Sequence, residues 1–203
     1  MRILIARHGQ TEWNLQHRVQ GQGDSPLTAT GAAQAEALAD AWQDQGIAEI
    51  VSSTLGRARE TARIVAARLG CACRAEAGLG EQRFGDYEGW QVPRLRERHP
   101  EIDDIFQGRL PDLAPPGGES FREAAQRTLQ ALAALPAEPA RTVGVIAHGN
   151  CLKGLLWLLS GEEGEAERFR HANASFSELR ADAAGLKIVR WCVDDHLRSA
   201  IDA

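Results

Sequence analysis

The stretch Arg2–Ala6 (RILIA), which runs directly into Arg7-His8-Gly9, decides the fold. A short apolar run with branched side chains is typical of a strand that is buried on both faces of a parallel sheet. A second run of this kind, Thr142–Ala147 (TVGVIA), ends in His148-Gly149-Asn150. Ligands of open α/β sheets bind beyond the carboxyl ends of the strands. Both histidines are therefore expected to face one crevice.

Helix and strand patterns alternate along the rest of the chain. Apolar residues at helical spacing, bounded by capping residues, Gly or Pro, predict helices over 28–45, 57–69, 120–135 and 151–159. Residues 47–53 have the pattern of another strand, and residues 175–180 and 186–193 alternate like an antiparallel pair. This order predicts an α/β fold, a three-layer α/β/α sandwich with a mostly parallel central sheet.

The length of 203 residues suits one domain with a sizeable core, so residues 1–203 are predicted to form a single domain. Within it, the stretch 85–119 contains Pro and Gly and has weak periodicity, except for a short helical piece over 93–99. We expect this stretch to be an inserted loop region that forms a lid over the site.

Composition excludes several classes of protein. A formal net charge of −5 and a pI near 5.7 argue against a nucleic-acid partner, because binding to a phosphate backbone draws on a surplus of Lys and Arg. No apolar stretch approaches the roughly 20 residues that span a bilayer, and the chain begins with a strand-like run, so no membrane partner is expected. The four cysteines form neither a C-x2-C pair nor a regular disulfide framework. Free thiols in a reducing cytoplasm are therefore expected.

Residues 7–14 (RHGQTEWN) open a series of ordered motifs. The series continues with 20–21 (QG), 24–28 (DSPLT), 53–58 (STLGRA), 81–89 (EQRFGDYEG) and 147–150 (AHGN). Together these motifs resemble the signature of the histidine phosphatase superfamily, which includes cofactor-dependent phosphoglycerate mutases and many small-molecule phosphatases. The resemblance implies a phosphoglycerate mutase-like fold and phosphoryl transfer through a phosphorylated histidine.

The resemblance assigns catalytic roles to His8, Glu81, Arg7, Arg57 and His148. His8 is the residue that becomes phosphorylated, since an imidazole offers an unprotonated nitrogen near neutral pH when its other nitrogen donates to a fixed acceptor. Arg7, Arg57 and His148 supply N–H donors for the negative charge of the transferring phosphoryl group. Glu81 matches the family's proton donor and can then activate the water that hydrolyses phospho-His8.

Six further residues are expected to bind substrate: Asn14, Gln20, Gly21, Thr11, Gly149 and Asn150. None of these steps demands a metal ion or a cofactor, and no cluster in the sequence has metal-ligand spacing.

Some positions leave a choice open. Arg57 and Arg59 both lie where a side chain could reach an anion at a helix start, and the spacing to Thr61-Ala62 selects Arg57. Residues 117–120 (GGES) fit a helix cap and a substrate-contacting loop about equally well. The remaining histidines, which have no partner motif, are interpreted as structural: His17, His99, His171 and His196.

The sequence favours a phosphatase over a mutase. Mutases of this family carry extra basic residues for a second phosphate, namely a lysine three residues after the glycine that matches Gly89 and a pair of arginines further on. Here the first position is Val92, and only Arg109 lies in the second region. His148-Gly149-Asn150 with the nearby Lys153 is nevertheless mutase-like, so a phosphoglycerate mutase-type phosphotransferase is the alternative. A second alternative is a non-catalytic, phosphate-binding regulatory module.

The expected partner is a small-molecule phosphomonoester. Candidates that the resemblance allows are phosphorylated sugars, phosphoglycerate, phosphoserine and α-ribazole phosphate. Specificity is expected to come from residues 83–119, whose aromatic and basic side chains either face the substrate or pack the loop: Phe84, Tyr87, Trp90, Arg94 and Phe106. The oligomeric state stays open between a monomer and a homodimer, although dimers are common among such enzymes.

Overall fold

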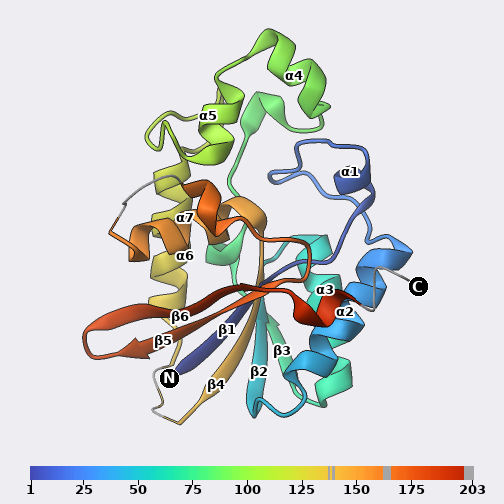
Figure 1. Ribbon diagram of the computed structural model, residues 1–203, viewed down its shortest axis with the longest axis vertical. Helices are drawn as coiled ribbons and strands as arrows, with labels where there is room; N and C mark the ends of the chain where they lie inside the picture. Colours follow the sequence, from blue (N-terminus) through green and yellow to red (C-terminus); the bar gives the residue numbers. More distant parts are fainter. Residues whose placement is uncertain (137, 139, 162–165, 199–203) are drawn as a thin grey trace.

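The computed structural model describes residues 1–136, 138, 140–161 and 166–198 (Figure 1). Its centre is a six-stranded sheet in the order β3-β2-β4-β1-β5-β6. The strands are β1 (Arg2–Arg7), β2 (Ile47–Ser52), β3 (Ala72–Ala75), β4 (Thr142–Ala147), β5 (Phe176–Asp182) and β6 (Gly185–Val193). Strands β3, β2, β4 and β1 run parallel, whereas β5 pairs antiparallel with both β1 and β6. The predicted mostly parallel sheet is confirmed.

Helices cover both faces of this sheet. The helices are α1 (Glu12–Leu15), α2 (Ala29–Trp42), α3 (Gly56–Leu69), α4 (Val92–Arg98), α5 (Ile102–Gln107), α6 (Phe121–Ala133) and α7 (Gly149–Leu159). Ile3 and Ile5 of β1 lie in the core cluster with α6 and α7, while Leu4 and Ala6 lie in the cluster with α2 and α3. Because successive side chains of a strand point to opposite faces, an unbroken apolar strand forms two cores. This arrangement confirms the three-layer α/β/α sandwich.

The register of β1 and β4 sets the position of the two His-Gly motifs. Arg2 pairs with Thr142 and Arg7 with Ala147, so the two strands end side by side. The backbone N–H of His8 then donates to the carbonyl of Ala147 at 3.0 Å. Both histidines therefore leave the sheet at the same edge.

Three short elements lie outside the sequence prediction. Strand β3 is the parallel edge strand, and all of its residues are exposed, so it has no burial pattern that a sequence could reveal. Helices α1 and α5 have four and six residues, too few for a helical period to stand out. Their stability comes from local capping and from tertiary contacts. In α1, Thr11 and Asn14 form a capping box.

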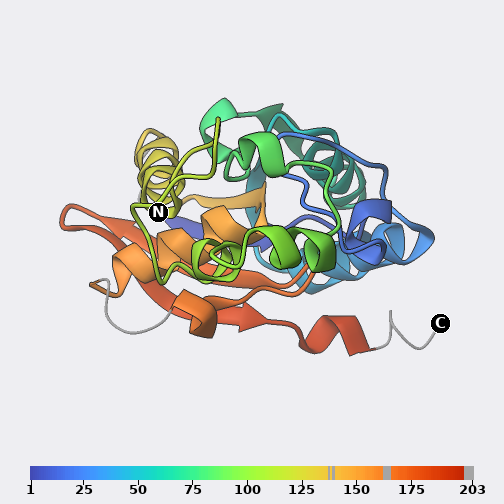
Figure 2. The ribbon, with the colours of Figure 1, turned by 90° about the horizontal axis from the view of Figure 1, so that it is seen from above.

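The stretch 85–119 lies at the end of the molecule to which the carboxyl ends of the parallel strands point, as Figures 1 and 2 show in green. Together with Val19 and Phe84 it forms a small core of its own around Tyr87, Leu95, Ile102 and Ile105. The predicted helical piece over 93–99 corresponds to α4. The action of residues 85–119 as a lid stays a prediction.

Two further observations concern the chain as a whole. All four cysteines are free. In the part of the chain that the structure describes, no helix is long and apolar enough to cross a membrane. The single-domain prediction stays a prediction, and its last residues, 199–203, lie outside the described residues.

Candidate active site

His8 is buried where β1 ends, and its ring is held by its own loop. Its Nδ1 lies 2.7 Å from the carbonyl oxygen of Gly9. Since a carbonyl can only accept, this contact assigns the proton to Nδ1 and leaves Nε2 unprotonated. Burial, together with the charges of Arg57 and Arg7, holds the pKa of His8 well below its usual value. His8 is thus a neutral imidazole with a nucleophilic Nε2.

Arg57, in the first turn of α3, is the cation that contacts this nitrogen. Its Nε donates to His8 Nε2 at 3.3 Å, and its two terminal nitrogens donate to the carbonyls of Gly23 and Gly21, each at 2.8 Å. The carboxylate of Asp24 accepts from the Arg57 backbone N–H at 3.2 Å and from its side chain at 3.3 Å. These contacts fix the guanidinium in a fully buried place, while Arg59 lies exposed on the surface.

Arg7 and His148 bring further donors to the same place. Arg7 Nη1 donates to the carbonyl of His171 at 2.8 Å, and the His148 ring centroid lies 5.2 Å from that of His8. Burial, with nearby Arg57, keeps the pKa of His148 well below its usual value, so its imidazole is neutral. Arg7 Nε and both ring nitrogens of His148 are buried without a hydrogen-bond partner among the described residues. The neutral ring of His148 has one N–H donor, and Arg7 Nε is another. Buried donors are expensive to leave unpaired, so these two favour an anionic ligand.

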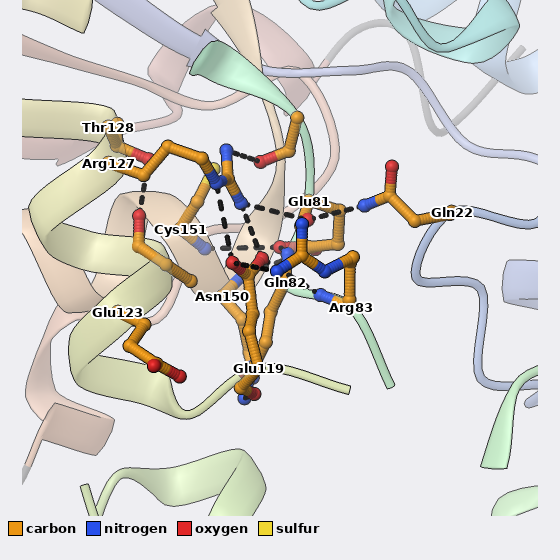
Figure 3. A network of polar contacts seen from close by, with 12 residues as sticks. Gln22, Glu81, Gln82, Arg83, Glu119, Glu123, Arg127, Thr128, Asn150 and Cys151 are labelled. Atoms are coloured by element: carbon orange, nitrogen blue, oxygen red, sulfur yellow. Dashed lines mark hydrogen bonds and ion pairs between the residues drawn. The ribbon is translucent and has the colours of Figure 1, made fainter. Parts of the chain in front are cut away.

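Glu81 lies at the N-terminus of α7, where its carboxylate occupies the place of a helix cap (Figure 3). Its Oε1 accepts from the backbone N–H groups of Gln82 at 2.9 Å and Cys151 at 3.1 Å. Among the described residues, its Oε2 accepts only from Asn150 N–H, at the longer distance of 3.3 Å. His148, the N-cap residue, has no side-chain cap contact of its own. The helix therefore orients Glu81, with Oε2 as the less tightly held oxygen.

A partly buried ion pair between Arg127 and Glu119 supports the backbone of Glu81 (Figure 3). Arg127 of α6 donates to Glu119 at 2.6 Å and to the Glu81 carbonyl at 3.2 Å. Gln82 donates to the Glu119 carbonyl at 3.0 Å and accepts from Asn150 Nδ2 at 2.9 Å. Sequence reasoning did not identify these supporting residues, because only the fold brings α6, α7 and the 81–83 loop together.

The open choice at residues 117–120 is resolved by the same region. Ser120 is the N-cap of α6 and forms a capping box with Glu123. Glu119 is buried and pairs with Arg127, and it does not line the catalytic cavity. The helix cap is the reading that the structure shows.

A cavity of about 190 Å³ joins these groups. Of the residues predicted from sequence, those that line it are Arg7, His8, Asn14, Gln20, Gly21, Arg57, Glu81 and Asn150. His148 is not among the lining residues, although its ring centroid lies 5.2 Å from that of His8. Gly149 packs against Arg7, whose Nε would be 3.5 Å from a Cβ placed there. Thr11 does not line the cavity, because its hydroxyl accepts from Gln20 Nε2 at 3.0 Å and from Asn14 N–H at 3.2 Å.

The outer wall of the cavity consists of residues to which the sequence prediction gave no role or an open one: Arg18, Val19, Phe84, Val92 and Phe106. The rings of Phe84 and Phe106 meet edge to face, with centroids 5.1 Å apart. Tyr87 packs in the small core instead, with Trp90 against it. Of the aromatic candidates, only Phe84 and Phe106 reach the cavity.

Among the described residues, no group of three or more His, Cys, Asp or Glu side chains is placed to hold a metal ion. The lining of the cavity combines the hydrogen-bond donors of two arginines with the carboxylate of Glu81 and the neutral ring of His8. Such a set can stabilise a phosphoryl group that is being transferred to nitrogen.

Comparison with known proteins agrees with this geometry. Residues 3–194 match the model of the histidine phosphatase superfamily (branch 1). The chain is 35% identical over 196 residues to a probable phosphoglycerate mutase GpmB of Klebsiella pneumoniae, covering 96% of this chain and 91% of that protein.

Two solved structures are close in fold. Bacillus stearothermophilus YhfR superimposes with a TM-score of 0.87 at 28% identity, covering 97% of this chain and 99% of that one. A mycobacterial glucosyl-3-phosphoglycerate phosphatase superimposes with a TM-score of 0.82 at 29% identity, covering 95% and 99%. With a family match over nearly its whole length, the chain belongs to the histidine phosphatase superfamily, branch 1.

Proposed function

We propose that this enzyme is a phosphatase that hydrolyses small phosphomonoesters, without a metal ion, through a phosphohistidine at His8. One observation carries the proposal. The unprotonated Nε2 of His8 lies beside Arg57, in a cavity that Arg7 also lines, and buried donors of Arg7 and His148 have no partner among the described residues. A phosphoryl group next to His8 would satisfy these donors.

In the first step, His8 Nε2 attacks phosphorus and forms the N–P bond, while the P–O bond to the leaving alkoxide breaks. Arg7, Arg57 and His148 donate to the phosphoryl oxygens and stabilise the charge on them. Glu81 gives its proton to the leaving oxygen. We assign this proton to Oε2, because that oxygen makes the single, longer contact to Asn150.

In the second step, Glu81 takes a proton from a water molecule, and the oxygen of that water attacks phosphorus. The N–P bond breaks, its electron pair returns to His8 Nε2, and inorganic phosphate leaves. The hydrogen bond from His8 Nδ1 to the Gly9 carbonyl persists through both steps and keeps the ring oriented.

Hydrolysis is favoured over transfer by the outer wall. Val92 lines the cavity where the family's mutases have a lysine, and Arg109 donates to Asp104 at 2.6 Å outside the cavity. The ammonium of the mutase-like Lys153 donates to the Phe106 carbonyl at 2.5 Å, and Lys153 does not line the cavity. The name of the mycobacterial neighbour, a phosphatase, supports the same reading.

A mutase-type phosphotransferase is the second candidate. The observation that favours it is the name of the curated relatives, which are probable phosphoglycerate mutases at 34–37% identity. A non-catalytic binding module is disfavoured, since His8, Arg57 and Glu81 all line one cavity with their side chains fixed.

The test is an assay of the wild type and His8→Ala against p-nitrophenyl phosphate and a panel of phosphomonoesters, with EDTA present throughout. We expect the wild type to release phosphate and to form an acid-labile, base-stable phosphoprotein, and His8→Ala to do neither. A matched control is His17→Asn, because His17 is exposed and its φ of 51° suits Asn.

Three other results would count against the proposal. Loss of activity in EDTA would contradict metal independence. Interconversion of phosphoglycerates after priming with a bisphosphate, without hydrolysis, would support the mutase. Phosphate binding without turnover of any ester would support the binding module.

A further inference from the structure

A second pocket adjoins the catalytic cavity on the side of α4. It is an open surface pocket of about 560 Å³, whose lining includes Arg18, Trp90, Arg94, Glu97 and Arg98. The side chains of Arg94, Glu97 and Arg98 are exposed. We call it the arginine pocket. Arg18 also lines the catalytic cavity, so this one side chain borders both spaces.

The backbone fixes the position of the arginine pocket relative to the cavity. Val19 N–H donates to the Trp90 carbonyl at 2.9 Å, Gly89 N–H to the Val19 carbonyl at 2.8 Å, and Val92 N–H to the His17 carbonyl at 2.8 Å. Arg18 itself donates from Nη1 to the Gly89 carbonyl at 2.7 Å. The two segments therefore hold the pocket and the cavity together as neighbours.

The arginines of this pocket differ from most others in the protein. Arg18, Arg94 and Arg98 form no ion pair with any residue that the structure describes. By contrast, Arg96 of the same helix donates to Asp103 at 2.8 Å. Arg98 lies over the Trp90 ring, 5.4 Å from its centroid.

Charge accumulates here although the chain as a whole carries a net charge of −5. Three arginines face one glutamate, Glu97, in the lining of the pocket. Unpaired guanidinium groups of like charge repel one another, and an oxyanion among them removes this repulsion and accepts their hydrogen bonds. The pocket is therefore suited to a carboxylate or a phosphate.

The small size of the catalytic cavity gives this pocket a role. At about 190 Å³ the cavity is smaller than the roughly 300–1,000 Å³ of typical ligand pockets, and its outer wall is apolar except for Arg18. The remainder of a longer substrate must leave the cavity. An anionic end would pass from Arg18 to Arg94 and Arg98.

We propose that the arginine pocket binds a second oxyanion at the far end of the substrate, so that the enzyme prefers phosphomonoesters with a distal carboxylate or phosphate. The inference rests on the proposed function, which supplies the phosphoryl end. It differs from a mutase site, because a mutase must bring both of its phosphates to the same histidine, whereas this pocket lies outside the cavity.

The test measures binding, so that it does not depend on turnover. By calorimetry, wild type, the double variant Arg94→Gln/Arg98→Gln and the control Arg96→Gln are titrated with ω-phosphonoalkanoates of four to eight carbons and with their carboxyl methyl esters. A matching series of alkane bisphosphonates distinguishes a distal phosphate from a distal carboxylate. Arg96 is a fair control, since it lies on the same helix, pairs with Asp103 and does not line the pocket.

We expect at least one chain length to bind wild type about fivefold more tightly as an anion than as the neutral ester, with the preference falling in high salt. The double variant should lose this preference, and Arg96→Gln should retain it. Equal affinities for anion and ester at every chain length in wild type, or an unchanged preference in the double variant, would overturn the inference. The same preparations are assayed with p-nitrophenyl phosphate, so failure of the phosphatase activity is seen separately.

Discussion

The floor of the catalytic cavity, formed by Arg7 and Arg57, is charged, whereas its outer wall is mostly apolar. On the floor, Arg57 is buried and Arg7 is half-buried, and their guanidinium groups are held mainly by backbone carbonyls. In the wall, Phe84, Val92 and Phe106 present apolar side chains, with Arg18 at the border. Carbonyl dipoles orient a cation without neutralising it, and the Asp24 carboxylate, 3.3 Å from Arg57 Nη1, offsets only part of the positive charge of the two arginines. The remaining charge is suited to a phosphoryl group. From this difference we expect the floor to carry the chemistry and the wall to select the substrate.

The largest effect is expected from the floor, on replacing Arg57. Arg57→Lys cannot reproduce contacts to His8, Gly21 and Gly23 at once, because an ammonium lacks the planar fork. We expect kcat for p-nitrophenyl phosphate to fall by about 10²- to 10³-fold. Arg59→Lys, on the exposed side of the same helix, should stay near wild type. Equal losses in the two variants would break the distinction between a charged floor and a solvated surface.

The next effect separates proton transfer from charge stabilisation. Glu81→Gln keeps the shape of the side chain but cannot donate a proton as an acid, so kcat for alkyl phosphates should fall by about 10²-fold or more. The loss should be smaller with p-nitrophenyl phosphate, whose leaving group needs little protonation. Single-turnover rates with the two substrate types measure this ratio. A loss that does not depend on the leaving group would contradict the assignment of Glu81 as the acid.

The burial of His171, whose carbonyl accepts from Arg7, should affect how the free energy of unfolding depends on pH. Burial, followed by the charge of Arg7, lowers the pKa of His171 to about 4. The unfolded chain therefore binds this proton first, and its contribution to stability, present above pH about 6.5, is lost as the pH falls toward about 4. Urea unfolding of wild type should show a decrease of up to about 3 kcal/mol from this residue, since each pKa unit is worth about 1.4 kcal/mol.

His171→Gln is the matched comparison for this pH dependence. The variant removes the titrating ring, whose nitrogens lie 3.1 Å from Ser175 and from Ser177. Its free energy of unfolding should decline less steeply between pH 6.5 and 4 than that of wild type. His8 and His148 act in the same direction and remain in both proteins. An equal decline of the free energy of unfolding in the two proteins would show that His171 is better hydrated than its burial indicates.

The smallest effect is expected from the wall. Phe106→Ala removes a ring from the cavity but leaves the carbonyl that accepts from Lys153. We expect KM for an aryl phosphate to rise about threefold to tenfold with kcat within about twofold, since the ring makes no contact that changes in the transition state. Leu113→Ala, at an exposed position of the same region, is the control. A large decrease in kcat would show that Phe106 contributes to the chemical step and not only to substrate binding.

Much of the site could be predicted because its residues follow regular elements. His8 and His148 come directly after apolar strands, and Arg57 opens a helix with clear periodicity. By contrast, Phe84, Val92 and Phe106 belong to a stretch whose small core draws on both ends of the segment and on Val19. No local period identifies residues that meet only through such packing. Thr11 shows the reverse case, since a motif residue near the nucleophile turns out to be used within its own loop.

The sequence by itself determined the three-layer architecture, the expectation that two histidines follow strands at one end of the sheet, and the family. It could do so because the burial of continuous apolar strands and amphipathic helices depends on local pattern, and because the motifs lie at the ends of these elements. Only the tertiary structure decided which atoms face the cavity, that α7 and Arg127 hold Glu81, and that unpaired arginines of α4 lie beside Arg18. These are contacts between segments far apart in the chain, and their geometry follows from packing that no single segment encodes.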